Sequence, residues 1–103
     1  MMTLTEDIKR ECGDRIVDVM KDYETQTNLT AYSVRLLKKV VVDGGTLTAE
    51  EIGAMNMAEA LHNWIVAMRT VQATLIATQN ATYADDSHWP AEPPGASAFV
   101  DQF

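Results

Sequence analysis

The sequence predicts an all-α protein: a small helical bundle with one long C-terminal helix, at about residues 49–78, and an extended tail that contains Trp and Pro. Three observations predict this fold. Apolar residues recur at helical spacing in three successive segments. Thr48 stands three residues before Glu51, which is the signature of a capping box at a helix start. From there to residue 78 the chain has no proline and only one glycine.

Length and charge limit the possible functions. The chain has 103 residues and a net charge of -7, which suits one small domain and disfavours binding to nucleic acid or to an anionic membrane. No stretch of about 18 uncharged apolar residues is present, so we expect no membrane partner. We expect residues 1–78 to form the helical domain and residues 79–103 to form an extended C-terminal arm.

The first predicted helix covers about residues 5–23. Its apolar positions are spaced for one helix face: Ile8, Cys12, Ile16, Val19 and Tyr23. A neighbouring face is acidic and carries Asp7, Glu11, Asp14, Asp18 and Asp22. This acidic stripe is either a solvated face relieved by nearby Arg and Lys side chains, or a surface for a basic partner.

The second predicted helix covers about residues 30–42, after a polar turn at residues 24–28. Its apolar stripe is Tyr32, Leu36, Leu37, Val40 and Val41. Asp43-Gly44-Gly45 is a helix stop signal, because glycine readily adopts the left-handed conformation. A short hairpin over residues 40–48 is the alternative, disfavoured because its arms have only about three residues each.

The third predicted helix, at residues 49–78, carries two parallel seams. Large apolar residues step by four and three, as at the a and d positions of a coiled coil: Met57, Leu61, Trp64, Met68, Val71 and Leu75. One position back runs a second seam of small or short polar residues: Asn56, Ala60, Asn63, Ala67, Thr70, Thr74 and Ala77. Either this helix is the centre of a three-helix domain, or one seam contacts a partner or a second copy. A second helix of 13 residues is too short to cover it, which favours the latter.

Three aromatic residues of the arm are candidate anchors, because a free tail would leave their apolar rings exposed to water. Trp89, Phe99 and Phe103 are therefore expected to dock on this chain or on another, and Trp89 most of all. Prolines at positions 90, 93 and 94 disfavour regular structure around them.

Residues for catalysis or metal binding are scarce, and we expect neither an enzyme nor a cofactor. His62 sits beside Trp64 on the long helix, where a packing role is expected. His88 follows two aspartates, but its spacing matches no compact metal motif. Cys12 has no histidine nearby in sequence and lies on an apolar face, so core packing is expected.

Two short segments resemble the C-terminal part of small tail assembly and tail-fibre assembly proteins of tailed phages. The matching positions are Trp64 and Arg69 on the long helix, then Trp89, Pro90 and Pro93 in a Trp-Pro-x-x-Pro ending. The resemblance covers about residues 61–93. It implies a non-enzymatic structural or assembly protein that binds another tail component, in the virion or in the host cytoplasm.

Two functions follow from the sequence. The first is a phage structural or assembly protein that binds protein, including itself as a homo-oligomer. Its predicted contact residues are the large-residue seam of the third helix together with Trp89, Phe99 and Phe103. The alternative is an acidic inhibitor whose stripe of five carboxylates occupies a basic surface of a nuclease or of a nucleic-acid-binding complex.

Overall fold

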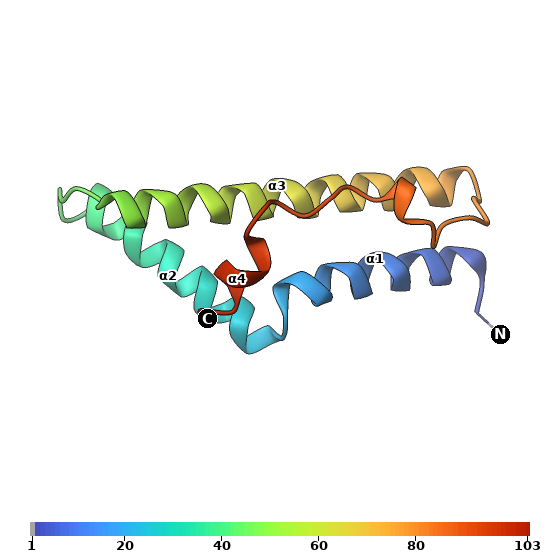
Figure 1. The fold of residues 1–103 in the computed structure, drawn as a ribbon, viewed down its shortest axis with the longest axis horizontal. Helices are drawn as coiled ribbons and strands as arrows, with labels where there is room; N and C mark the ends of the chain where they lie inside the picture. Colours follow the sequence, from blue (N-terminus) through green and yellow to red (C-terminus); the bar gives the residue numbers. More distant parts are fainter. Residues whose placement is uncertain (1) are drawn as a thin grey trace.

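The computed structural model describes residues 2–103 and shows an elongated helical molecule of 53 × 23 × 22 Å (Figure 1). The prediction of an all-α fold is confirmed, since the described residues contain helices and no strand. The elements are α1 (Leu4–Met20), α2 (Tyr23–Val41), α3 (Ala49–Ala77), the short 3₁₀ helix η1 (Asp86–His88) and α4 (Ala96–Val100).

Helix α3 spans the length of the molecule, and the other elements are arranged along it (Figure 1). Helix α1 packs against α3, and α2 runs obliquely from the end of α1 back to the start of α3. After α3 the chain turns and returns along it, ending in α4 between α2 and α3. The longest helix was predicted correctly to within one residue, but it is followed by α4 and is therefore not the last one.

The end of the first helix was predicted three residues too late. Helix α1 ends at Met20 because Lys21 adopts a left-handed backbone conformation, with φ of 65°. Its start follows the sequence signal, since the Thr3 side chain accepts a hydrogen bond from the Glu6 backbone N–H at 3.1 Å.

The predicted turn at residues 24–28 is wrong, because these residues form the first turns of α2. Asp22 caps this helix: its carboxylate accepts a hydrogen bond from the Thr25 N–H at 2.8 Å. Helix α2 therefore has 19 residues. It ends before Gly44, whose φ of 67° makes the turn, so the helical interpretation of this region is confirmed and the hairpin is excluded.

The start of α3 is held by the predicted capping box. The Thr48 side chain accepts a hydrogen bond from the Glu51 N–H at 3.1 Å, and the Glu51 carboxylate accepts one from the Thr48 N–H at 2.9 Å. Lys39 of α2 forms an ion pair with the same carboxylate at 2.7 Å. This cluster fixes the α2–α3 turn.

The arm at residues 79–103 was predicted to be extended. The structure shows instead that it contains two short helices and folds back onto the bundle. It forms η1 and α4, and it places Trp89, Ala96 and Val100 in the hydrophobic core. Gly95, with φ of 81°, precedes α4 and provides the left-handed turn that directs this helix inward. The core is therefore built from α1, α2, α3 and the arm together.

Three carboxylates at helix starts have lowered pKa values. The backbone N–H of Thr25 lowers the pKa of Asp22, and that of Ser87 lowers the pKa of Asp85. The hydrogen bond from Lys39 lowers the pKa of Glu51, with a second contribution from the Thr48 N–H. These groups bind protons less readily in the folded chain than in the unfolded chain.

We expect the free energy of unfolding to fall as the pH drops from the unfolded-state pKa values of these groups through their lower folded-state values. A lowered folded-state pKa gives a stabilisation that is fully present above the unfolded value, 3.8 for aspartate and 4.5 for glutamate, and that is lost as the pH falls through the folded value. Urea unfolding between pH 7 and pH 3 measures this loss. The Glu51→Gln variant, which can keep the capping box, should lose less stability over the same range. An equal loss in both proteins would contradict the assigned role of Glu51.

Candidate functional site

Five of the nine predicted contact residues are buried within their own chain. Each is at most 7% exposed: Leu61, Trp64, Met68, Leu75 and Trp89. They form the core with residues of α1 and α4. The large-residue seam of α3 therefore faces the chain's own helices and arm, and these five side chains offer no surface to a partner in this conformation.

Two tryptophan side chains bind the arm to the bundle. The Trp64 indole N–H donates to the Pro90 carbonyl at 3.1 Å, and the Trp89 indole N–H donates to the Tyr83 carbonyl at 2.7 Å. Both rings bury a large apolar area while their polar N–H groups are satisfied. The predicted docking of Trp89 is confirmed, and its docking site is on this chain.

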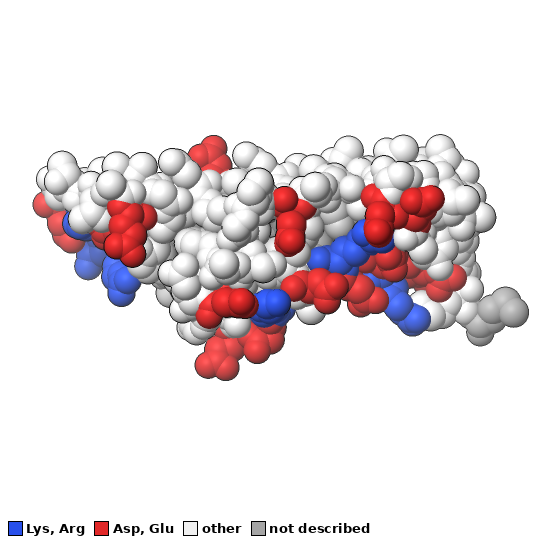
Figure 2. Space-filling model, viewed as in Figure 1, with Lys and Arg blue, Asp and Glu red and all other residues white. Residues whose placement is uncertain are grey.

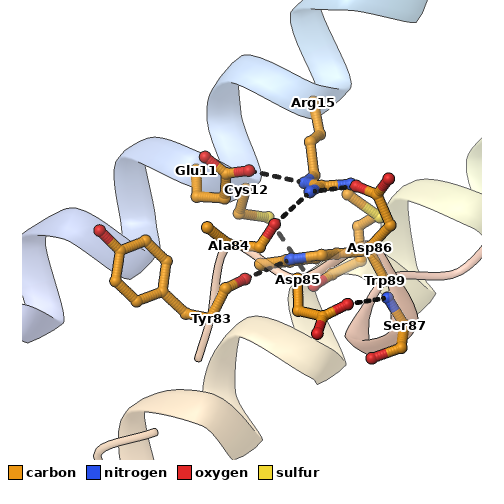
Figure 3. A network of polar contacts seen from close by, with 10 residues as sticks. Glu11, Cys12, Arg15, Tyr83, Ala84, Asp85, Asp86, Ser87 and Trp89 are labelled. Carbon is orange, nitrogen blue, oxygen red and sulfur yellow. Dashed lines mark hydrogen bonds and ion pairs between the residues drawn. The ribbon is translucent and has the colours of Figure 1, made fainter. Parts of the chain in front are cut away.

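Arg15 of α1 also binds this part of the arm, through the polar contacts drawn in Figure 3. Its guanidinium donates to the Glu11 carboxylate at 2.9 Å, to the Ala84 carbonyl at 3.0 Å and to the Asp86 carboxylate at 2.8 Å. It also lies over the Trp89 ring, 5.5 Å from the centroid. Every polar contact of this cluster is made within the chain, so we assign it a structural role.

The acidic stripe of α1 is divided among several roles. Glu11 pairs with Arg15, and Asp22 caps α2. Asp7 is half-buried. Asp14 and Asp18 are exposed, and their carboxylates form neither an ion pair nor a helix cap with another described residue. Figure 2 shows basic atoms interleaved with the acidic ones along α1, and a nearly uncharged surface along α3. The inhibitor alternative therefore depends mainly on the exposed carboxylates of Asp14 and Asp18, and it stays a prediction.

The aromatic residues of the arm's end lie on one side of the space between α2 and α3, where they line a groove of about 310 Å³. The Phe103 ring lies 5.3 Å from the Phe99 ring and 5.4 Å from the Tyr32 ring, centroid to centroid. The Asn28 side chain donates to the Phe103 carbonyl at 3.2 Å. Met57 lines the same side, and both phenylalanines are half-buried. Val71, the last of the nine predicted residues, is also half-buried and packs against the core.

The opposite side of the space between α2 and α3 is open and apolar. Three side chains of α2 form a ridge along it, at positions i, i+3 and i+7: Val34, Leu37 and Val41, which are 58%, 52% and 76% exposed. We call these three residues the α2 ridge. Val40 lies next to them and is 42% exposed. Only Leu29 and Leu36 of this 19-residue helix are buried.

A groove of about 330 Å³ runs beside the ridge, and we call it the α2–α3 groove. Its walls include Leu29, Val34 and Leu37 of α2 and Leu61, His62 and Ile65 of α3. No Lys, Arg, Asp or Glu lines it. The ridge and groove together form an apolar surface that the chain does not cover itself, and we take them as the candidate functional site.

The sequence of α2 carries apolar residues on more than one face of the helix, and the pattern alone does not show which face is buried. Of the predicted apolar stripe of the second helix, the structure buries Leu36 and half-buries Tyr32, but it exposes the other three residues, Leu37, Val40 and Val41. The apolar positions of α2 occupy more than one face, which means that a helix packed on one side must leave the rest exposed.

The second seam of α3 is largely exposed, and its threonine hydroxyls form hydrogen bonds within the helix. Asn56, Asn63, Thr70, Thr74 and Ala77 are exposed, and Ala60 and Ala67 are half-buried. The Thr70 and Thr74 hydroxyls donate to the carbonyls of Val66 and Thr70, four residues back, at 3.0 and 3.2 Å. These bonds satisfy the hydroxyls within the helix.

The candidate catalytic and metal-binding residues are dispersed. His62 is exposed on α3, and His88 contacts the Thr82 hydroxyl at 2.9 Å. Cys12 is buried, and its burial raises the pKa of the thiol, which makes it a poor nucleophile at neutral pH. Within residues 2–103 no three His, Cys, Asp or Glu side chains are grouped as a metal site would require.

Comparison with known proteins gives no match to any family model, curated protein or solved structure. None of the helices in the described residues is long and apolar enough to cross a membrane.

Proposed function

We propose that this chain is a non-enzymatic structural or assembly protein of a tailed phage, and that it binds another virion component or a second copy of itself through the α2 ridge and the α2–α3 groove. The observation that carries the binding role is the exposure of the ridge. Its three apolar side chains are each more than half exposed and lie beside an uncharged groove. Contiguous apolar surface of this kind is typical of protein interaction sites.

The energetics support a binding role for this face. Complete burial of a Val or Leu side chain contributes about 1.5–3 kcal/mol relative to its exposed state. The chain leaves more than half of each ridge residue exposed, so about half or more of this contribution is not used, although comparable side chains of α3 are buried almost completely. A partner that covers the ridge would gain it.

The phage assignment depends on the resemblance at residues 61–93. Three residues of that motif lie close together in the structure, although one belongs to α3 and two to the arm. Trp64, Trp89 and Pro90 lie together, since the Trp64 indole donates to the Pro90 carbonyl and both rings are in the core. Arg69 is exposed. In this protein the motif joins the long helix to the arm, and the binding surface lies elsewhere, on α2.

Immunoprecipitation from the native source, followed by mass spectrometry, tests the proposal. We expect the wild-type protein to capture a phage structural component, and Leu37→Asp to lose it. Val17→Asp is the matched control, because Val17 is equally exposed, at 54%, but lies on α1. This control should capture the component as the wild type does.

Two results would overturn the proposed function. One is capture of no phage component by the wild-type protein. The other is salt-sensitive capture of a nuclease that is lost in an Asp14→Asn, Asp18→Asn variant and kept in Leu37→Asp, which would favour the acidic inhibitor instead.

A further inference from the structure

We infer that the α2 ridge and the α2–α3 groove bind a second copy of this chain, in a two-fold dimer that seats the ridge of each copy in the groove of the other. This inference deepens the proposed function, because it names the partner of the same surface. Four observations lead to it: the position of the arm, the shape of the surface, the charges at its edges and its size.

The arm at residues 79–103 does not cover this surface. Its end is engaged on the other side of the space between α2 and α3, where Phe103 contacts the Tyr32 ring and its carbonyl accepts the bond from Asn28. Trp89 and Val100 are fixed in the core. The described arm therefore cannot reach the groove without giving up these contacts.

The surface is complementary to itself. A two-fold interface brings the same patch of both copies together, so the patch must contain a protruding part and a recess that fits it. The α2 ridge is exposed, and the walls of the groove next to it contain the partly exposed apolar side chains of Ala58 and Ile65. Because the groove has no charged residue in its lining, an inserted valine or leucine leaves no charge buried and unpaired.

The charges at the outer edges have opposite signs. Lys38 follows Val34 by four residues and precedes Val41 by three, so it flanks the ridge. Glu59 lies three residues before His62, on the outer side of the groove. Both are exposed, and neither forms an ion pair with another described residue. A two-fold axis along the groove places α2 of one copy against α3 of the other and brings these opposite charges closer.

The size of the surface sets the expected strength of the dimer. The 19 residues of α2 span about 28 Å, and two neighbouring helices of about 10 Å diameter give a face of about 550 Å². Stable interfaces bury about 800 Å² per partner, so this dimer falls in the weak, reversible class. The net charge of -7 on each copy opposes association further at low salt.

Sedimentation equilibrium at about 10–500 μM protein and about 0.15 M salt tests the dimer in its expected affinity range. The wild-type mass should rise with concentration from 11.4 kDa toward twice that value. Leu37→Asp should remain at 11.4 kDa at every concentration, with an unchanged helical circular dichroism spectrum. Val17→Asp should behave as the wild type.

A charge reversal tests the two-fold arrangement. Lys38→Glu should raise the dissociation constant about twofold to fivefold, and Glu59→Lys should do the same, as is typical of exposed charge pairs. The double variant should restore the wild-type constant, since every copy then carries the reversed pair. Failure of the double variant to recover would overturn the placement of α2 against α3.

The inference and the proposed function can fail separately. A wild-type chain that stays at 11.4 kDa at the highest concentration, or a Leu37→Asp variant that dimerises normally, overturns the dimer. A monomeric chain that still captures a phage component through Leu37 overturns the dimer alone. A dimer that captures no phage component overturns the phage assignment alone.

Discussion

Replacement of Trp89 by alanine should lower the free energy of unfolding by about 3–5 kcal/mol, the usual cost of removing a buried tryptophan. Trp89 is 7% exposed, donates a 2.7 Å hydrogen bond to the Tyr83 carbonyl and lies under the Arg15 guanidinium. Its loss removes apolar burial and two specific contacts of the arm. Urea unfolding followed by circular dichroism measures the effect. Because domains have about 5–15 kcal/mol of total stability, this loss is a large fraction of the whole and should shift the unfolding midpoint clearly.

Tyr23→Ala is the control for the removal of an aromatic side chain. Tyr23 is 84% exposed, so its replacement should change the free energy of unfolding by less than about 0.5 kcal/mol. Limited proteolysis gives a second measurement: the arm should be cleaved readily in the Trp89 variant and slowly in the control. If the Trp89 variant matched the control in both measurements, the arm would not be docked as described.

Replacement of Leu61 by alanine should cost about 2–5 kcal/mol of stability, whereas the same change at Leu37 should cost less than about 0.5 kcal/mol. Leu61 is 1% exposed and Leu37 is 52% exposed, although both are leucines on adjacent helices. The pair separates residues that hold the chain together from residues that are free to bind. Urea unfolding should be measured at about 1 μM, where a weak dimer is dissociated and cannot stabilise Leu37.

The opposite ranking of the two leucine variants would contradict the packing described above. It would mean that α2 turns its ridge inward in solution and that the large-residue seam of α3 is free. In that arrangement the partner would contact the large-residue seam of α3, as the periodicity of the sequence predicts.

Several parts of the fold could be predicted from the sequence because their signals are local. The Thr48 and Glu51 pair marks the start of α3, and the absence of proline up to residue 78 gives its length. Trp89 was expected to dock because a free tail does not stabilise an exposed tryptophan. Each of these predictions depends on residues that are close together in the chain.

The boundary between α1 and α2 could not be predicted from the same signals. Asp22 belongs by spacing to the acidic stripe of the first helix, and only the backbone shows that it caps the next one. The left-handed conformation of Lys21 has no sequence signal, since lysine seldom adopts it. The polar residues after Asp22 are the solvated first turns of a helix, which resemble a turn in composition.

Which apolar residues stay exposed depends on long-range packing, and the sequence alone could not show it. The a and d spacing of α3 correctly identified its large apolar face, but it could not show that α1 and the arm would cover that face. Trp89, Ala96 and Val100 come from a segment with no helical period, yet they occupy core positions beside Leu61 and Met68. With the large-residue seam of α3 covered from within, α2 is the helix with the most large apolar side chains left exposed.

Hydrogen–deuterium exchange, compared between the free and the assembled protein, locates the binding surface most directly. If the α2 ridge and the α2–α3 groove are the interface, amides of residues 34–42 should exchange more slowly on assembly, while those of residues 68–75, which lie on α3 beyond the groove, should change little. Slower exchange confined to residues 68–75, with residues 34–42 unchanged, would contradict the assignment of α2 as the binding helix.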